Sequence, residues 1–263
     1  MNQKKIDYGI ALSGGGHKGI AHAGVLQFLL EQNIEPQIIS GTSAGSIVGS
    51  LYALGKSPVE ILKFFQSVSL FNWNHLSFRK AGLLDADKFI TYLNDIFEDK
   101  KLKDLDKEVY ISATDIKTGK LKIFNSNTLV KEAVAASCAF PGVFSPVTVD
   151  GKIYSDGGIL NNYPVNTIQG RCDFLIGVNV NPVLSFKDDS KLHSIKSVAI
   201  RAFEIMMMQN AASQNELCDW HIMPEKLADY NTFETSKKRM DEIFNIGYND
   251  AKREYEKIKH KIE

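Results

Sequence analysis

The chain has 263 residues, and 44% of them are hydrophobic, which is enough to bury one large core. Lysine plus arginine and aspartate plus glutamate each number 31, so the formal net charge is zero. This balance gives no support for a nucleic-acid partner or for strong attraction to an anionic membrane surface.

The hydrophobic pattern and the turn residues predict strands and helices that alternate along the chain. Strands are expected at residues 8–12, 37–40, 109–115, 121–124, 147–149, 152–154 and 174–180, with a further apparent strand at 220–223. Helices are expected at residues 20–32, after residue 43 to about 54, 59–68, 87–97, 129–138, 195–217 and from about 236. This order predicts an α/β fold with a mostly parallel sheet, and no repeat or linker divides residues 1–263.

Cysteine usage and hydropathy bear on the compartment. Cys138, Cys172 and Cys218 are widely spaced and lack metal-ligand spacing, so we expect buried, reduced thiols and no metal site. No apolar run is long enough to predict a transmembrane helix, and residues 1–7 lack the features of a signal peptide. We therefore expect a cytoplasmic protein.

Two apolar segments are open to two interpretations each. Residues 69–84 crowd aromatic and aliphatic side chains among polar ones, with no regular period. They either cap a lipophilic groove or pack on the domain. The three methionines at 206–208 lie in an expected helix and either fill the core or line an acyl groove.

A serine between glycines is the first candidate for chemistry. Ser43 lies in the sequence Gly41-Thr42-Ser43-Ala44-Gly45, between an expected strand and an expected helix. Such a strand-to-helix turn is typical of a nucleophile elbow, which directs the serine hydroxyl toward a substrate.

A glycine loop, GGGHKG at residues 14–19, lies one helix upstream of this serine. Gly14-x-Gly16-x-x-Gly19 matches the dinucleotide-binding fingerprint, but the second strand does not end in the acidic residue that would bind the ribose. A P-loop is excluded because Lys18 precedes glycine rather than serine or threonine. Two interpretations remain: a tight structural turn, or an oxyanion loop that offers backbone N–H groups.

A serine nucleophile needs a base within hydrogen-bonding reach, and histidine is the usual one. None of the histidines downstream of Ser43 lies in the glycine-bounded loop where a catalytic histidine is expected, so each is interpreted as a surface or packing residue. These histidines are His75, His193, His221 and His260.

An aspartate has the better setting for the base. Asp156 follows an expected strand, and Gly157-Gly158 lets the backbone turn sharply beside another loop. A Ser43–Asp156 dyad is one interpretation and an ordinary aspartate turn is the other. Asp115 and Asp173 remain competing acids.

Taken together and in this order, three blocks resemble the patatin-like phospholipase family, close to its small bacterial members. The blocks are GGGHKG at 14–19, GTSAG at 41–45 and DGG at 156–158. The flanking segments 135–144 and 158–165 are also similar to those of the family. The resemblance covers roughly residues 7–182, whereas the helical part at about 191–263 is not distinctive.

The resemblance implies a three-layer α/β/α sandwich that hydrolyses acyl esters with a Ser-Asp dyad and without histidine. Ser43 is then the nucleophile and Asp156 the general base, and the reaction needs neither cofactor nor metal. The implied substrate is an acyl ester or phospholipid, with transient contact to a membrane surface. The rival hypotheses are a Ser-Asp-His α/β-hydrolase and a lipid-binding or regulatory protein with incidental esterase activity.

The same resemblance assigns the oxyanion hole to backbone amides of the glycine loop. These are the amides of Gly14, Gly15 and Gly16, chiefly the last two. The mechanism that we hypothesise from the residues adds the Ala44 N–H as a further donor. Lys18 occupies a position where the family carries arginine or lysine. It either supports the loop or attracts a phosphate head group, and Gly157 is a further supporting position.

Overall fold

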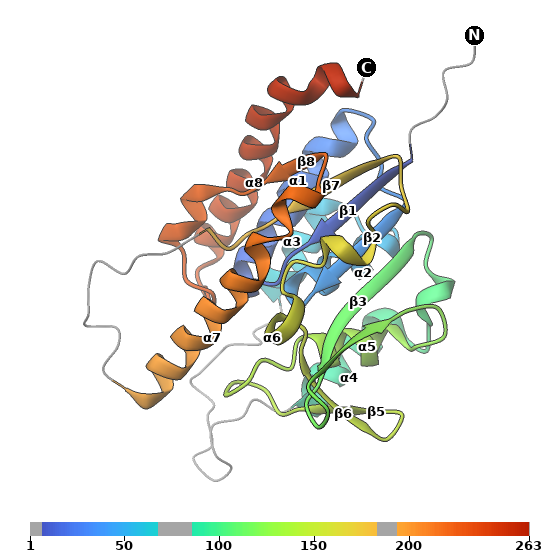
Figure 1. The fold of residues 1–263 in the computed structure, drawn as a ribbon, viewed down its shortest axis with the longest axis vertical. Helices are drawn as coiled ribbons and strands as arrows, with labels where there is room; N and C mark the ends of the chain where they lie inside the picture. Colours follow the sequence, from blue (N-terminus) through green and yellow to red (C-terminus); the bar gives the residue numbers. More distant parts are fainter. Residues whose placement is uncertain (1–6, 68–85, 183–193, 263) are drawn as a thin grey trace.

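A single twisted sheet organises the chain in the computed structural model, which describes residues 7–67, 86–182 and 194–262 (Figure 1). The strand order is β5-β6-β3-β2-β1-β7-β8, with β4 paired to β3. The pairings among β3, β2, β1, β7 and β8 are parallel, and those that involve β4, β5 and β6 are antiparallel. The strands are β1 Tyr8–Leu12, β2 Ile38–Thr42, β3 Glu108–Asp115, β4 Lys120–Phe124, β5 Val147–Val149, β6 Lys152–Asp156, β7 Phe174–Val178 and β8 Trp220–Ile222.

Helices cover both faces of this sheet, which confirms the three-layer α/β/α architecture (Figure 1). The long helix expected to reach residue 217 ends at Ala212, and a separate 3-10 turn follows at Asn215–Leu217. The short helix α6 was not predicted. The helices are α1 Ile20–Glu31, α2 Ala44–Ala53, α3 Pro58–Ser67, α4 Ala86–Phe97, α5 Val130–Ser137, α6 Gly158–Asn161, α7 Ile195–Ala212 and α8 Lys237–Ile258.

The two faces of the sheet hold cores of unequal size. Because successive strand residues point to opposite faces, Ile10 and Leu12 of β1 enter the main core, whereas Ala11 faces the other side. The main core is shared with α1–α5 and α8, and the smaller one with residues 163–168 and the end of α7. Both faces of the central strands are therefore apolar, as expected for a parallel sheet.

The strand directions place three loops at one edge of the sheet. The carboxyl ends of β1 and β2 lead into the glycine loop and into Ser43, and parallel strands end at the same edge. Asp156 ends β6 and pairs with Ala113 of β3, one residue beyond the pairing of Thr42 with Ser112. Strand β3 therefore brings Asp156 to the same edge as Ser43.

The structure bears on two expectations from composition, the state of the cysteines and the absence of a membrane-spanning helix. The three cysteines are free thiols, but only Cys138 is buried, while Cys172 and Cys218 are partly exposed. Among the helices described, none combines the length and the apolar character that a membrane crossing requires. The apolar segment at 69–84 lies outside the described residues.

Candidate active site

The backbone makes a sharp turn at Ser43, between the end of β2 and the start of α2. Ser43 has φ 52° and ψ −121°, a conformation that few residues other than glycine adopt. The flanking glycines allow the close packing: a Cβ on Gly41 would lie 2.6 Å from the Gly45 carbonyl oxygen, and one on Gly45 would lie 2.2 Å from that of Leu12. The structure thus places Ser43 on the strained elbow that its sequence predicted.

Hydrogen bonds hold the Ser43 peptide on both sides. The Ser43 N–H donates to Ser137 Oγ at 2.8 Å. The Ser43 carbonyl oxygen accepts from Ser46 Oγ at 2.6 Å and from the Ser46 N–H at 2.9 Å. A strained turn costs about 1–3 kcal/mol and persists where the surroundings fix it. Sequence reasoning gave Ser137 no role, because nothing local to residue 137 indicates contact with residue 43.

The Asp156 side chain is completely buried at the end of β6. Its Oδ1 accepts a hydrogen bond from the Gly158 N–H at 2.7 Å. Burial raises the pKa of Asp156 to about 7, against the lowering effect of that bond and of a hydrogen bond from the Ser43 side chain. A carboxyl with this pKa changes protonation near neutral pH, as a general base requires.

The contact between Ser43 and Asp156 is not a fully formed hydrogen bond. Oδ2 of Asp156 has no partner of good distance and angle among the described residues, yet the Ser43 hydroxyl is close enough to lower the Asp156 pKa. The Ser43 hydroxyl therefore lies near the Asp156 carboxylate without the geometry of a full hydrogen bond. Catalytic hydrogen bonds are often loose in the absence of substrate and tighten when it binds.

The glycine loop uses its first amide for structure. The Gly14 N–H donates to the Asn162 carbonyl oxygen at 2.9 Å. No described residue accepts a hydrogen bond from the N–H of Gly15 or Gly16. Gly16 has φ 58°, and a Cβ there would lie 2.2 Å from the Thr232 carbonyl oxygen. Two adjacent amides are thus left to bind a ligand, on a backbone that only glycine fits.

Three of the competing bases have other partners, and a fourth lies near the C-terminus. His221 Nδ1 lies 3.0 Å from the Tyr163 hydroxyl, and His260 belongs to a 3-10 turn near the C-terminus. Asp115 accepts two N–H bonds from the turn between β3 and β4, and Asp173 accepts the Asp7 N–H. His75 and His193 lie outside the described residues.

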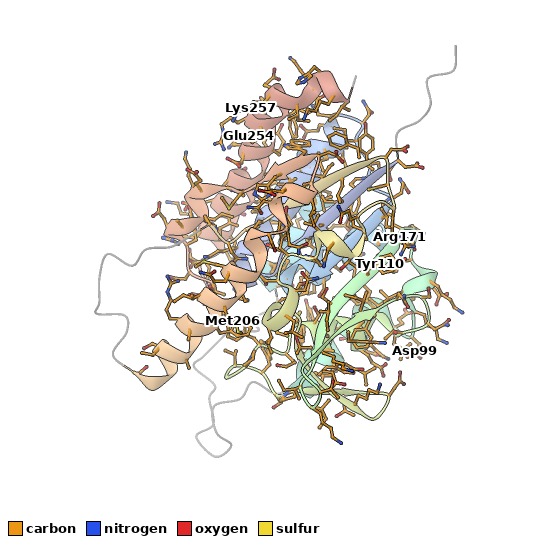
Figure 2. All side chains as sticks on the ribbon, in the orientation of Figure 1. Asp99, Tyr110, Arg171, Met206, Glu254 and Lys257 are labelled. Carbon is orange, nitrogen blue, oxygen red and sulfur yellow. The ribbon has the colours of Figure 1, made fainter. Side chains whose placement is uncertain are left out.

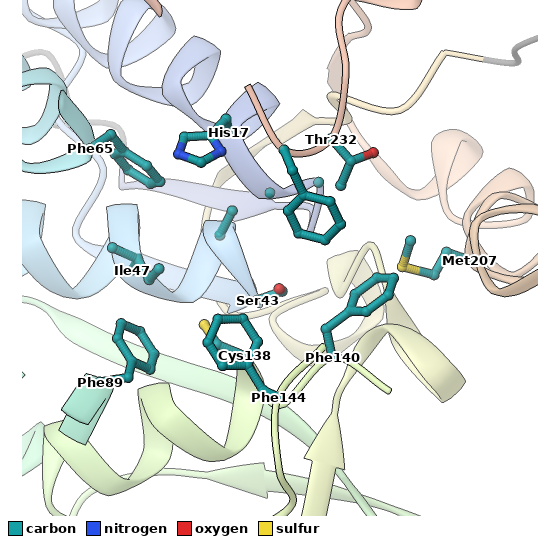
Figure 3. A pocket seen from close by; sticks show the side chains of 14 residues that line it. His17, Ser43, Ile47, Phe65, Phe89, Cys138, Phe140, Phe144, Met207 and Thr232 are labelled. Atoms are coloured by element: carbon teal, nitrogen blue, oxygen red, sulfur yellow. The ribbon is translucent and has the colours of Figure 1, made fainter. Parts of the chain in front are cut away.

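An apolar pocket surrounds Ser43 and holds about 640 Å³ of free space, its mouth included (Figure 3). Ile47 and Phe89 lie on one side of the Ser43 hydroxyl, and Phe140 and Met207 lie on the other. The apolar lining suits an acyl chain. The lining residues are Gly15, Gly16, His17, Ser43, Ala44, Ile47, Phe65, Phe89, Cys138, Phe140, Phe144, Met207, Thr232 and Phe233.

The pocket lies at the boundary between the main core and a third apolar cluster, which is distinct from the smaller core on the other face of the sheet. Ile47 and Phe89 belong to the main core. We term this third group the satellite cluster; it includes Phe140, whose ring centre lies 4.5 Å from that of Phe203. Of the three methionines in α7, Met207 lines the pocket and Met206 is exposed. The buried members of the satellite cluster are Phe140, Val143, Phe144, Phe203 and Met207.

The two basic residues of the glycine loop are both buried. Burial lowers the pKa of His17 to about 4, so its ring is neutral at pH 7, and it contacts Phe65 edge-on in the pocket wall. Lys18 is 2% exposed and is absent from the described pocket lining. Burial lowers the pKa of Lys18; on α7, the Glu204 carboxylate acts to raise this pKa and the Arg201 guanidinium acts to lower it.

The remaining site residues are close-packed at the elbow and at the acid turn. Ala44 lines the pocket beside Ser43, and a Cβ on Gly19 would lie 2.5 Å from the Ala44 Cβ. A Cβ on Gly157 would lie 2.3 Å from the Ser112 carbonyl oxygen, so the turn after Asp156 needs glycine to approach β3.

Comparison with known families agrees with this geometry. Residues 10–168 match the family model described as patatin-like phospholipase. The chain belongs to the patatin-like phospholipase family. The match includes Ser43, Asp156 and the glycine loop. The family resemblance inferred from the three sequence blocks is thereby confirmed.

Relatives of this patatin-like chain include longer proteins. An uncharacterised NTE family protein of Mycobacterium tuberculosis is 35% identical over 176 residues, which are 65% of this chain and 48% of that protein. The lysophospholipase nte1 of Aspergillus fumigatus is 27% identical over an alignment 283 residues long, which covers 95% of this chain and 18% of that protein. The chain thus spans about half or less of the length of these relatives.

Among solved structures, VipD from Legionella pneumophila shares the fold. Its TM-score is 0.64 at 16% sequence identity, and the match covers 97% of this patatin-like chain and 67% of VipD. Because identity is low, this likeness concerns the fold alone.

Proposed function

We propose that this patatin-like protein is a serine acyl hydrolase that cleaves lipid esters with a dyad of Ser43 and Asp156. The main support is the pairing of the elbow serine with a buried carboxylate whose pKa lies near 7, beside an apolar pocket. Ordinary structural aspartates are solvated or paired with cations, whereas this one is buried with a hydroxyl.

In the proposed reaction, Ser43 Oγ attacks the ester carbonyl carbon while Asp156 takes the hydroxyl proton. The C–O bond to the alcohol then breaks, and the alcohol leaves with the proton from Asp156. A water molecule next gives a proton to Asp156 and adds to the acyl carbon. Ser43 departs, recovers the proton, and the carboxylic acid is released.

The developing oxyanion is assigned to the amides of Gly15 and Gly16, with the Ala44 N–H at the start of α2 as a third donor. The engagement of the Gly14 amide by Asn162 favours this choice. Gly14 contributes instead by having no side chain, since a Cβ there would lie 2.4 Å from the Asn162 Oδ1 and 3.2 Å from the Ser43 Cβ. Each donor of such a hole is worth about 10²–10³ in rate.

The apolar lining supports a fatty acyl chain as the group bound beside Ser43. The name of the Aspergillus relative, a lysophospholipase, is in line with a phospholipid or lysophospholipid substrate. We assign Lys18 to support of the loop, because its buried side chain faces the charges of α7 rather than the pocket.

Transient contact with a membrane surface is part of the same proposal. The outer face of α7 exposes Val198, Ile205 and Met206, which is labelled in Figure 2, at 52%, 42% and 38%. The inner face of the same helix carries Met207 into the pocket wall. An apolar helix face next to a lipid pocket is suited to the interfacial region of a bilayer.

A fluorophosphonate probe and a panel of p-nitrophenyl esters and phospholipids test the proposed function. We expect the wild-type protein to label and turn over, and Ser43→Ala to do neither. Asp156→Asn should retain its fold and lose activity. A folded wild type that never labels would indicate a binding module instead, and activity in Asp156→Asn would exclude the dyad. Loss of activity in His221→Ala would favour the triad.

A further inference from the structure

A buried serine connects the nucleophile elbow to the strand beside the acid. The Ser137 hydroxyl accepts the Ser43 N–H at 2.8 Å and donates to the Ser112 carbonyl oxygen at 2.7 Å. Ser137 is fully buried at the last position of α5. Its single hydroxyl thus acts as acceptor and donor at once, which joins α5, the elbow and β3.

Strand β3 also fixes the position of Asp156. Ala113 pairs with Asp156 across the β3–β6 ladder. The Thr114 hydroxyl donates to the Asp156 carbonyl oxygen at 2.9 Å. Gly157 packs so closely that a Cβ would lie 2.3 Å from the Ser112 carbonyl oxygen, the atom that also accepts from Ser137. Asp156 and the elbow at Ser43 are therefore both held in place by residues 112–114 of β3.

The elbow needs such a constraint. Ser43 has a strained backbone with φ 52°, and no described group other than Ser137 accepts its N–H. Without that acceptor, the Ser43 backbone would keep the hydrogen bonds to its carbonyl oxygen, from Ser46, but none from its N–H. A shift of about 1 Å at a reacting group can reduce the rate by about 10²-fold.

We propose that Ser137 is a positioning residue, which fixes the Ser43 hydroxyl relative to the Asp156 carboxylate by bridging the Ser43 amide to the Ser112 carbonyl. This inference rests on the proposed serine hydrolase activity. Ser137 acts through the backbone of Ser43, so it affects the chemical step and leaves the pocket that binds the acyl chain intact.

Steady-state kinetics on a p-nitrophenyl ester test the proposal. Ser137→Ala should lower kcat by about 10- to 100-fold and change KM by less than about threefold, because misplacement of the nucleophile impairs chemistry more than binding. The rate of fluorophosphonate labelling should fall in parallel. Ser137→Cys keeps the shape with a weaker acceptor and should have an intermediate kcat.

Ser40→Ala is the matched control. Ser40 is also fully buried, and its hydroxyl donates to the Pro164 carbonyl oxygen at 2.8 Å without contacting the Ser43 amide. Both alanine variants lose a buried hydroxyl, so their melting temperatures should fall by a similar amount, about 2–8 °C. Only Ser137→Ala should lose kcat.

The outcomes separate this inference from the proposed function. An unchanged kcat in Ser137→Ala, or an equal loss in Ser40→Ala, would overturn the positioning role. If Ser137→Ala does not fold, a wild-type kcat in Ser137→Cys would overturn it as well. A wild-type protein that is folded, inactive and unlabelled would instead refute the hydrolase assignment itself.

Discussion

The buried acid predicts that activity and stability respond to pH in opposite ways. Burial raises the pKa of Asp156 from its ordinary value of 3.8 to about 7. Between those values the native protein retains a proton that the unfolded chain releases. The free energy of unfolding must therefore fall as pH rises from about 4 to about 7. At about 1.4 kcal/mol per pH unit, the total fall is about 4 kcal/mol.

Asp156→Asn removes this penalty, because asparagine has a similar shape and cannot ionise. Its Oδ1 can still accept the Gly158 N–H that Asp156 accepts. We expect the variant and the wild type to be similarly stable near pH 4, and the variant to be more stable by up to about 4 kcal/mol at pH 8. Urea unfolding at pH 4, 6 and 8 measures the difference.

Catalytic activity should change with pH in the direction opposite to stability. The proposed base works only as the carboxylate, so kcat/KM of the wild type should rise with pH and level off above about pH 7. The exposed Asp95 on α4 provides the control Asp95→Asn, since this substitution makes the same chemical change outside the buried site. A stability difference between Asp156→Asn and wild type that is constant from pH 4 to 8 would refute the reasoning. So would full activity at pH 5.

Three further predictions concern the loop, the pocket and the helix face. Gly16→Ala forces a Cβ to within 2.2 Å of the Thr232 carbonyl oxygen, so kcat should fall at least about 100-fold in the ester assay, and unchanged turnover would exclude the loop as oxyanion hole. Ile47→Phe fills one side of the pocket and should reduce kcat/KM for C12 esters about tenfold more than for C4 esters; a uniform effect would place the acyl chain elsewhere. Ile205→Ser should halve or further reduce hydrolysis in phosphatidylcholine vesicles while C4 ester hydrolysis is unchanged, whereas Val59→Ser on α3 should affect neither.

Sequence reasoning succeeded where local chemistry determines structure. The residues before Ser43 form a buried strand, and the glycines on either side of Ser43 allow the close packing of a sharp turn, so the elbow could be placed within a residue. The alternation of apolar strands with helices predicted the α/β class for the same reason. The long helix α7 was extended too far, because the residues after Ala212 continue its composition but turn as a 3-10 helix.

Long-range partners could not be predicted from the sequence. Ser137 is one of many serines, and its bond to Ser43 spans 94 positions of sequence. The use of the Gly14 amide by Asn162 likewise depends on how the loop after β6 folds back. The environment of Lys18 depends on α7, which lies far along the chain. Each of these contacts is fixed by tertiary packing, which no local pattern encodes.

The location of the pocket between the main core and the satellite cluster has a thermodynamic consequence. Packed proteins leave few apolar voids, and this one has an open apolar pocket between two buried clusters. A bound acyl chain would join the two clusters as an additional piece of core. An unreactive alkyl ligand at a hundred times its dissociation constant should then add about 2.7 kcal/mol to the free energy of unfolding. Binding of the acyl chain and stability of the fold would thus be coupled, so lipid analogues should raise the melting temperature as well as inhibit turnover.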